Sequence, residues 1–454
     1  MIARVRGLFA GDALRARALR GTAITVFAFG SSNALRLASN LLLTRLLFPE
    51  AFGLMALVQV VLTGLAMFSD TGINLSIMQN PRALEPAFLR TAWTVQIGRG
   101  VLLWIATILL ALPMASFYGE PILAWMLPVV GLTVLISGLN SMRLYTANRA
   151  LLLGRITAID LGGQVTTIVL TVALALLLES VWALVIGAVL GALLKMALSH
   201  VLIPGPRDGL GWDRSVFDEL FGFGKWIFLS SIAGFLVGHA DRAILGKFID
   251  IATLGVFNIG YFLATVPMAL SSALTSRILM PVFVSITGDD PATGRRKLRR
   301  ARVLLVGGLI ALSVGTAVAG EWAIDLLYEP EYALAGPIVV LLALSNTVPV
   351  ITNAYPTVLL ARGKSRDFMV HICALAAVQT AVLLYGVGHY GIIGALVAPA
   401  LSTLLVYPVT ARLVARRGAW DPALDAIFLV LLATGAVLAL WVNPDAVPAV
   451  LATR

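Results

Sequence analysis

The chain has 454 residues, of which 59% are hydrophobic and 12% are charged, and its mean hydropathy is +0.94. Soluble domains carry about 25% charged residues, and a soluble chain this apolar would expose patches that aggregate. Composition therefore predicts an integral membrane protein and excludes a soluble enzyme, a nucleic-acid-binding module and a disulfide-stapled secreted domain. The single cysteine, Cys373, also excludes a disulfide within the chain and a cysteine zinc cluster.

Twelve stretches are long and apolar enough to cross a bilayer, which takes about 20 residues. They are Thr22–Leu43, Phe52–Ile77, Ala92–Leu112, Ile122–Asn140, Ile156–Leu178, Val181–His200, Phe223–Ile249, Leu254–Ile278, Val303–Ala323, Ile338–Leu360, Phe368–Val387 and Ile392–Arg412. Ala423–Val442 forms a thirteenth predicted helix, and the tail after it is too short to span again. These unbroken runs lack the alternation typical of membrane barrels.

Most of the 33 basic residues lie in alternate segments between the predicted helices. If the N-terminus starts inside, the outer segments hold only Arg45, Lys247 and Arg454. This bias places the N-terminus in the cytoplasm. A full-length first span without a small-residue cleavage site predicts that the chain has no cleavable signal. The net charge of +10 therefore indicates topology and not nucleic-acid binding.

The sequence repeats with a period of six helices. Helix one ends in Arg45-Leu-Leu-Phe-Pro-Glu-Ala-Phe-Gly53, and helix seven ends in Lys247-Phe-Ile-Asp-Ile-Ala-Thr-Leu-Gly255. Because six is even, the two halves have the same orientation. We predict an all-α polytopic membrane protein of about 12–13 transmembrane helices. Its two six-helix lobes would be related by a pseudo-two-fold axis along the membrane normal, with a central cleft.

The predicted domains follow from these spans. They are a cytoplasmic N-terminal segment (1–21), an N-lobe (22–200), a cytoplasmic connector (201–222), a C-lobe (223–412) and an extra C-terminal helix with its tail (413–454). The longest loops, Val201–Gly222 and Leu279–Arg302, are both cytoplasmic, and the basic run at 295–302 is interpreted as a topology anchor. The loops leave no room for a catalytic domain. With no phosphate-binding G-x-x-x-x-G-K-[ST] loop and four scattered histidines, we expect no enzyme activity, cofactor or metal site.

Polar side chains form helical stripes in four of the predicted spans. Helix one carries Asn33, Arg36 and Asn40 at three- and four-residue spacing, and helices two, seven and eight carry similar stripes. A single polar residue of this kind usually joins two helices. Four stripes together favour a hydrated cavity, because polar groups in a bilayer face protein or water. For Gly187-xxx-Gly191 and Gly234-xxx-Gly238 we favour close helix packing.

Five charged residues lie well inside the predicted spans: Arg36, Asp70, Arg99, Asp241 and Arg242. Arginine binds phosphate and pyrophosphate through its planar donor fork, so the three arginines are candidates for binding an anionic substrate. The alternative is a structural ion pair, of Arg242 with Asp241 or Asp70, or of Arg36 with an acid on a facing helix. For Asp70 the alternative role is a helix-terminal cap.

Two motifs resemble a known family. Helix one ends in Thr44-Arg-Leu-Leu-Phe-Pro-Glu-Ala-Phe-Gly-Leu54, and helix two ends in Ser69-Asp-Thr-Gly-Ile73. With the six-plus-six repeat and the arginine-bearing stripes, they resemble the polysaccharide transporter family of bacterial oligosaccharide flippases. The same superfamily contains multidrug-extrusion proteins and the lipid II flippase. The resemblance covers residues 20–415, and the thirteenth helix departs from the family's usual twelve or fourteen.

The resemblance implies a V-shaped, two-lobed transporter in the bacterial cytoplasmic membrane. Its substrate would be undecaprenyl-diphosphate-linked oligosaccharide, moved from the inner to the outer leaflet for exopolysaccharide, O-antigen of lipopolysaccharide, or capsule. Cavity cations would bind the diphosphate, and polar side chains would bind the sugars. The implied partners are membrane lipids and the polysaccharide polymerase and glycosyltransferases of the pathway, with the transporter itself a monomer.

Carried over onto this chain, the resemblance makes Arg36, Arg99 and Arg242 the candidates for the anionic headgroup. Asn33 and Asn40 are further candidates for substrate binding. The remaining acids, Asp70 and Asp241, are candidates for gating or ion coupling.

Three other functions remain open. A multidrug or cation exporter needs uncompensated acids in its cavity, whereas this chain has more arginines than acids there. A lipid II flippase would share the architecture. A membrane polymerase or ligase of oligosaccharides usually has a long periplasmic loop with catalytic groups, and none is found in the sequence.

Overall fold

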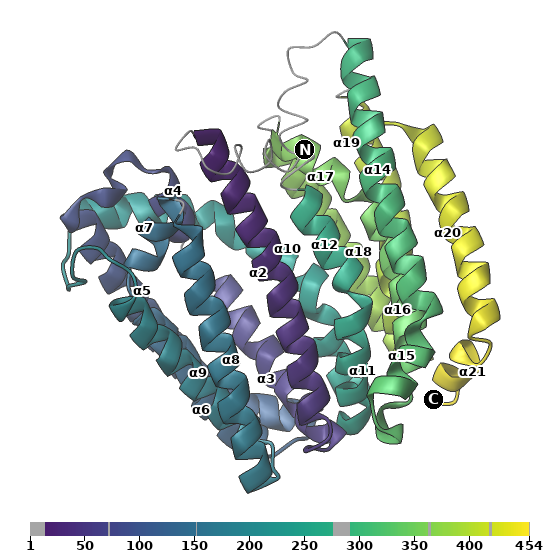
Figure 1. Cartoon of the computed structure of the whole chain (residues 1–454), viewed down its shortest axis with the longest axis horizontal. Helices are drawn as coiled ribbons and strands as arrows, with labels where there is room; N and C mark the ends of the chain where they lie inside the picture. Colours follow the sequence, from purple (N-terminus) through teal and green to yellow (C-terminus); the bar gives the residue numbers. More distant parts are fainter. Residues whose placement is uncertain are drawn as a thin grey trace, which may run out of the picture. The chain divides into compact units, whose positions relative to one another are not determined.

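The computed structural model describes residues 14–70, 73–150, 152–275, 291–361, 365–416 and 420–453 (Figure 1). Over these ranges the secondary structure is helical, without a strand, which confirms the all-α prediction. The chain divides into two compact units, which we describe separately. The first unit comprises Met1–Ala51 and Val58–Ser231, and the second comprises Phe52–Leu57 and Ile232–Arg454.

The first unit is built from long helices that pack in pairs. Its helices are α2 (Leu14–Leu43), most of α3 (Pro49–Phe68), α4 (Ile73–Gln79), α5 (Pro86–Tyr118), α6 (Leu123–Gly138), α7 (Arg143–Arg149), α8 (Leu153–Leu178), α9 (Trp182–Val201) and the start of α10 (Arg214–Phe248), with a 3-10 turn at Pro81–Leu84. Helix α5 packs on α6, α6 and α8 pack on α9, and α2 packs on α8 (Figure 1).

Glycines allow α8 and α9 to approach closely. A Cβ atom added at Gly187 would overlap Thr171, and one at Gly191 would lie 2.5 Å from the hydroxyl of Thr167. The packing role predicted for this pair is therefore confirmed. Gly238 differs, because no other described atom lies within 4 Å of the position that its Cβ would take. The second predicted packing motif is therefore wrong at that residue.

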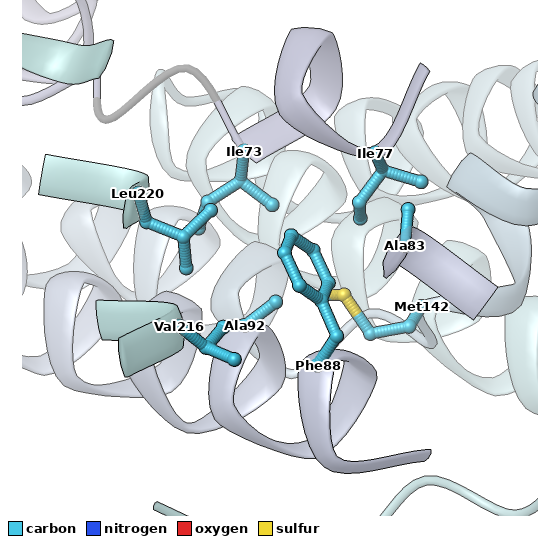
Figure 2. Packing of buried hydrophobic residues seen from close by; sticks show 8 residues of the cluster. All are labelled: Ile73, Ile77, Ala83, Phe88, Ala92, Met142, Val216 and Leu220. Atoms are coloured by element: carbon cyan, nitrogen blue, oxygen red, sulfur yellow. The ribbon is translucent and has the colours of Figure 1, made fainter. Parts of the chain in front are cut away.

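An apolar cluster joins α4, α5 and the beginning of α10 (Figure 2). Its members are Ile73, Ile77, Ala83, Phe88, Ala92, Met142, Val216 and Leu220, all of them buried. The Phe88 ring lies among the others and is fully buried. Burying a side chain of this size stabilises the fold by about 1.5–3 kcal/mol, so the cluster holds the start of α10 against α5.

The second unit surrounds one central helix. It contains the rest of α10, α11 (Ile251–Ala264), α12 (Val266–Leu274), α14 (Pro291–Val318), α15 (Gly320–Leu327), α16 (Ala335–Thr352), α17 (Ala354–Ala361), α18 (Ser365–Tyr390), α19 (Ile392–Ala415), α20 (Pro422–Val442) and α21 (Ala446–Leu451), with a 3-10 turn at Pro330–Tyr332. Helix α16 contacts α11, α14, α19 and α20. Of the residues in its most apolar stretch, 72% are buried, against 17% in the corresponding stretch of α8. Helix α16 therefore forms the core of its unit.

Among the described residues, nine helices are long and apolar enough to cross a membrane, or eleven if two bent pairs each count as one span. These eleven correspond to all the predicted spans except the first and the seventh, whose sequences lie in α2 and α10. The thirteenth predicted helix is α20, and it satisfies the same criterion.

Four predicted spans are interrupted. The predicted helix Phe52–Ile77 is wrong as one element, because α3 ends at Phe68 and α4 begins at Ile73. The hydroxyl of Ser69 donates to the Leu65 carbonyl (2.8 Å), a local bond that competes with helix continuation. The 41° bend between α11 and α12 interrupts Leu254–Ile278, and breaks at Ala319 and Asn353 interrupt Val303–Ala323 and Ile338–Leu360. The 58° bend between α6 and α7 follows the predicted span Ile122–Asn140, which is not interrupted. Pro267, which has no N–H to donate, lies at the start of α12.

Two predicted loop boundaries also change. Helix α10 begins at Arg214, well before the predicted Phe223. Helix α14 begins at Pro291, inside the predicted loop Leu279–Arg302, so the basic run ends within a helix. Residues 276–290 of that loop lie outside the described part. The predicted anchor role is wrong for Arg302, which is 1% exposed.

Gly386 of α18 and Gly394 of α19 give a direct test of helix packing in the second unit. A Cβ atom at Gly386 would lie 3.0 Å from the Cα of Gly394, and one at Gly394 would overlap the backbone of Gly386. We expect Gly394→Ala to destabilise the protein by about 1–3 kcal/mol through overpacking, seen as a lower Tm in detergent. Gly388→Ala is the matched control, since no described atom beyond its own helix backbone lies within 4 Å of its Cβ position. Equal Tm values for the two variants would contradict this packing.

Candidate functional site

In the first unit, Arg99 joins the middle of α5 to the end of α3. Its Nε atom donates to the hydroxyl of Ser69 (3.0 Å), and its Nη2 atom donates to the carbonyl of Ala66 (2.6 Å). The carbonyl belongs to the last turn of α3, whose final carbonyls have no partner within the helix. Asp70, which follows Ser69, interacts electrostatically with Arg99. The structure thus brings Arg99 and Asp70 together, beyond the end of α3.

Arg99 also lines a cavity of about 520 Å³ in the first unit. The walls of this cavity are mainly apolar side chains of α5, of the segment before α10 and of the start of α10, namely Val95, Leu102, Leu103, Trp212 and Phe217. Ser69 and Thr94 are the other polar lining residues. The surface of this cavity, here called the Arg99 pocket, is therefore almost wholly apolar, and the guanidinium in its wall is held by Ser69 and Ala66. Such a surface suits an apolar chain beside a fixed positive charge.

Three of the predicted residues lie on α2. The side-chain amide of Asn33 donates to the carbonyl of Phe29 (2.8 Å), and Arg36 is exposed and has polar or electrostatic contacts of its own. Asn40 accepts bonds from Thr44 through its backbone carbonyl. All three residues thus lie on one helix, as the predicted stripe requires.

A pair of hydrogen bonds fastens α2 to α8. The Ser32 hydroxyl donates to Gln164 Oε1 (2.8 Å), and Gln164 Nε2 donates back to the Ser32 carbonyl (3.0 Å). Ser32 precedes the stripe of Asn33 and Arg36 by one residue. This contact therefore fixes the rotation of the stripe within its unit.

In the second unit, Arg242 packs on an aromatic ring. The centre of its guanidinium lies 3.7 Å from the ring centroid of Tyr261 on α11, a cation–π distance. Asp241 accepts the backbone N–H of Arg242 (2.8 Å) and not its guanidinium. Within the described part of the chain, the Nε atom of Arg242 is buried without a hydrogen-bond partner. Arg242 thus contacts Tyr261 through the face of the ring and through a side-chain hydrogen bond, and not an acid through its guanidinium.

A buried charge network in the second unit was missed by the sequence interpretation. Arg302 of α14 donates through Nη2 to Asp425 of α20 (2.7 Å), and these residues are only 1% and 2% exposed. The hydroxyls of Tyr355 and Tyr407 donate to the other carboxylate oxygen (2.5 and 2.6 Å). Asp425 in an apolar helix was the available signal, because an acid within a span needs a partner. This network explains how the thirteenth helix belongs to its unit.

No metal site is evident in the described ranges: they contain no group of three or more His, Cys, Asp or Glu residues able to hold a metal ion.

Residues 42–335 match the model of a family described as "Polysaccharide biosynthesis protein". The match spans well over half of the chain. The chain belongs to this family.

Curated relatives and solved structures agree with this membership. The chain is 22% identical to the lipopolysaccharide biosynthesis protein WzxC of Escherichia coli over 87% of this chain and 81% of the relative. It is 23% identical to the teichuronic acid biosynthesis protein TuaB of Bacillus subtilis over 71% of this chain and 69% of the relative. The solved structure of the lipid II flippase MurJ, in an inward closed conformation, matches with a TM-score of 0.68 and 13% identity, covering 92% and 97% of the two chains. The fold is therefore similar to that of this structure.

Proposed function

We propose that this protein flips an undecaprenyl-diphosphate-linked oligosaccharide across the bacterial cytoplasmic membrane for the biosynthesis of a surface polysaccharide. The observation that carries the proposal is the Arg99 pocket, an apolar cavity within the first unit that has a guanidinium in its wall. A lipid-linked diphosphate has a matching character, with an anionic head beside an apolar chain. Family membership and the names of the relatives support a polysaccharide precursor as the substrate.

The energetic problem solved by such a protein is the passage of the diphosphate through hydrocarbon. Moving a charged group into an apolar medium without a partner costs tens of kcal/mol. Arginines placed at successive positions within the helices replace part of the lost hydration by charge-assisted hydrogen bonds. Alternating access of the two lobes would then expose the headgroup to one side at a time.

The proposed substrate residues are Arg36, Arg99 and Arg242, with Asn33 and Asn40. Among these, Arg242 lies on the Tyr261 ring, and its guanidinium is not neutralised by the neighbouring Asp241. Asp70 and Asp241 are proposed as gating or coupling acids. The distribution of basic residues supports a cytoplasmic N-terminus.

Two related activities share the fold, so fold alone does not choose between them. They are flipping of lipid II, as in the MurJ relative, and extrusion of a drug or another cation. The arginine in the Arg99 pocket disfavours a cationic substrate. The names of the relatives describe biosynthesis and transport proteins, and neither name mentions a polymerase.

Deletion of the gene in its own bacterium tests the proposed function. We expect loss of one surface polysaccharide and accumulation of its lipid-linked repeat unit, both reversed by the wild-type gene. Cell lysis on depletion would instead identify lipid II as the substrate, and sensitivity to cationic drugs with normal polysaccharide would identify an exporter. Either of these results would contradict the proposal.

A further inference from the structure

The first unit contains a second cavity of about 250 Å³, separate from the Arg99 pocket. It lies between the first turn of α5, the start of α7 and the segment that precedes α10. Its lining includes Pro86, Leu89, Arg90, Arg143, Arg207 and Asp208. None of them lines the Arg99 pocket. The cavity contains three arginines and one acid, and the proposed transport function assigns no role to it.

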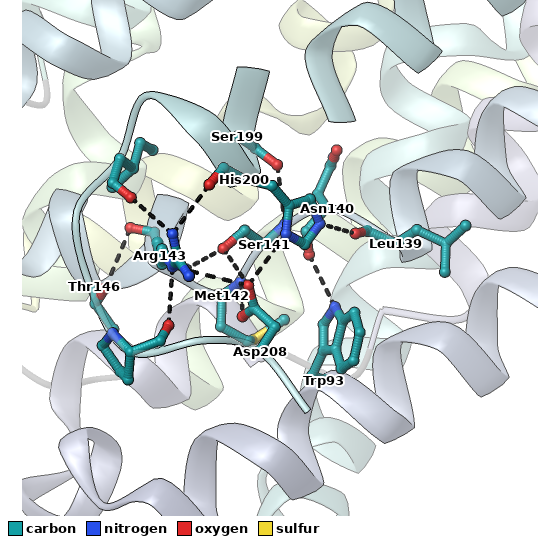
Figure 3. Close-up of polar contacts among 12 residues, drawn as sticks. Trp93, Leu139, Asn140, Ser141, Met142, Arg143, Thr146, Ser199, His200 and Asp208 are labelled. Carbon is teal, nitrogen blue, oxygen red and sulfur yellow. Dashed lines mark hydrogen bonds and ion pairs between the residues drawn. The ribbon is translucent and has the colours of Figure 1, made fainter. Parts of the chain in front are cut away.

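Asp208 connects the segments that form this cavity (Figure 3). It accepts a bond from the Ser141 hydroxyl (2.6 Å) and one from the backbone N–H of Met142 (3.0 Å). One of its oxygens also lies 4.0 Å from Nε of Arg143 and 3.4 Å from Nδ1 of His200. The carboxylate therefore neutralises charge on the inner side of the cavity, at Arg143.

The guanidinium of Arg143 is likewise hydrogen-bonded to the surrounding backbone. Its guanidinium donates to the carbonyls of Pro206 (2.9 Å), His200 (3.0 Å) and Ile203 (3.2 Å). It thus folds the segment after α9 back over the break between α6 and α7. The other two arginines, Arg90 and Arg207, are exposed cavity residues, and the cavity contains no second acid to balance them.

Hydrogen bonds hold the segment before α10 against α5 beside Arg90. The Thr94 hydroxyl donates to the Gly211 carbonyl (2.9 Å), and the backbone N–H of Gly211 donates to that hydroxyl (3.1 Å). The backbone N–H of Asp213 donates to the hydroxyl of Thr91 (3.0 Å). A Cβ atom at Gly211 would lie 2.8 Å from Cβ of Arg90, so the segment lies directly against α5 at this arginine. These contacts fix the position of Arg90 at the cavity.

The first turn of α5 forms part of the cavity wall through Pro86 and Leu89. Pro86 has no N–H, and the N–H of Leu89 donates to the carbonyl of Glu85 (3.1 Å). The positive charge at the cavity therefore comes from the arginines. The volume is below the range of about 300–1,000 Å³ usual for drug-sized ligands, so the cavity suits a headgroup and not a whole lipid.

From these observations we propose that Arg90 and Arg207, beside the first turn of α5, bind a phosphate group at the membrane surface. The group comes either from an anionic phospholipid headgroup or from a soluble phosphate compound. Basic pockets between transmembrane helices on the cytoplasmic side are suited to such headgroups. The charge distribution predicts that this end of the unit faces the cytoplasm.

Binding to the purified full-length protein in detergent tests this site. The probes are radiolabelled phosphatidylglycerol, diacylglycerol as the same lipid without phosphate, and inorganic pyrophosphate. The test variant is Arg90→Gln/Arg207→Gln, which leaves the structural guanidinium of Arg143 in place. The matched control is Arg155→Gln/Arg300→Gln, which removes two exposed arginines outside the cavity.

We expect the test variant to bind phosphatidylglycerol at least about tenfold more weakly than wild type, because two charge-assisted bonds are lost. The control should bind as wild type does. If phosphatidylglycerol binding depends on the two arginines, the bound phosphate belongs to a lipid headgroup. If only pyrophosphate binding depends on them, the bound phosphate belongs to a soluble compound. Equal binding of both phosphate probes by the test variant and wild type, or an equal loss for diacylglycerol, would overturn the proposal.

Discussion

Replacing Asp425 with Asn is expected to lower the free energy of unfolding of the second unit by about 3–5 kcal/mol, as the loss of one partner of a buried ion pair does. The substitution leaves the guanidinium of Arg302 charged and buried without its counter-ion. It also weakens the acceptor shared by Tyr355 and Tyr407. The measurement is Tm in detergent together with the amount of protein in the membrane.

Two comparisons separate this effect from the simple loss of a charge. Arg299→Gln removes a half-exposed partner of Asp421 on the same pair of helices, and such pairs contribute only about 0–1 kcal/mol. Arg302→Met/Asp425→Leu removes both buried charges and should recover most of the lost stability. A Tm for Asp425→Asn no lower than that of Arg299→Gln would show that α20 is not held by this network.

Replacing Arg242 with Ala is expected to reduce surface-polysaccharide export by about tenfold or more while the protein still reaches the membrane. The reason is that a charge-assisted hydrogen bond contributes about 1.5–3 kcal/mol, and 1.4 kcal/mol corresponds to a factor of ten. We expect a similar loss for Arg36→Ala. Export is measured as polysaccharide at the surface of a deletion strain that carries each variant.

Tyr261 distinguishes the functional role of Arg242 from a structural one. Tyr261→Phe keeps the ring under the guanidinium and should retain export, because the cation–π contact survives. Arg242→Lys keeps the charge but not the planar donor fork, so it should restore export only in part. Normal polysaccharide in both Arg36→Ala and Arg242→Ala would rule out the headgroup role of these arginines.

The membrane class and most of the spans were predictable from sequence, because a bilayer requires long apolar helices whatever their neighbours are. Breaks within spans were less predictable. Apolar residues lie on both sides of Ser69 and Thr265, whereas helix continuity depends on local hydrogen bonds and on Pro267. The family was also indicated by the sequence, through the motifs at residues 44–54 and 69–73, and the family match confirms it.

Charge partners could not be predicted in the same way. Arg302 was interpreted as part of a basic surface run, although it ends in a buried pair with a residue 123 positions away. Asp208 lies in a predicted connector, yet it fastens that segment to Ser141 and Met142. Both contacts join residues far apart in the chain, and neither follows from the spacing of residues within one helix.

By itself, the sequence determined that this protein crosses a membrane in about a dozen helices and that arginines lie inside several of them. Those properties are local, because they depend on the apolarity of each segment and on the high cost of charge in hydrocarbon. Only the tertiary structure decided which charges are already satisfied. It pairs Arg302 with Asp425 and places Arg242 on Tyr261, Arg99 in an apolar pocket, and Arg90 and Arg207 in a cavity of their own. The physical reason is that a side chain's free capacity to bind a ligand depends on neighbours brought to it by folding.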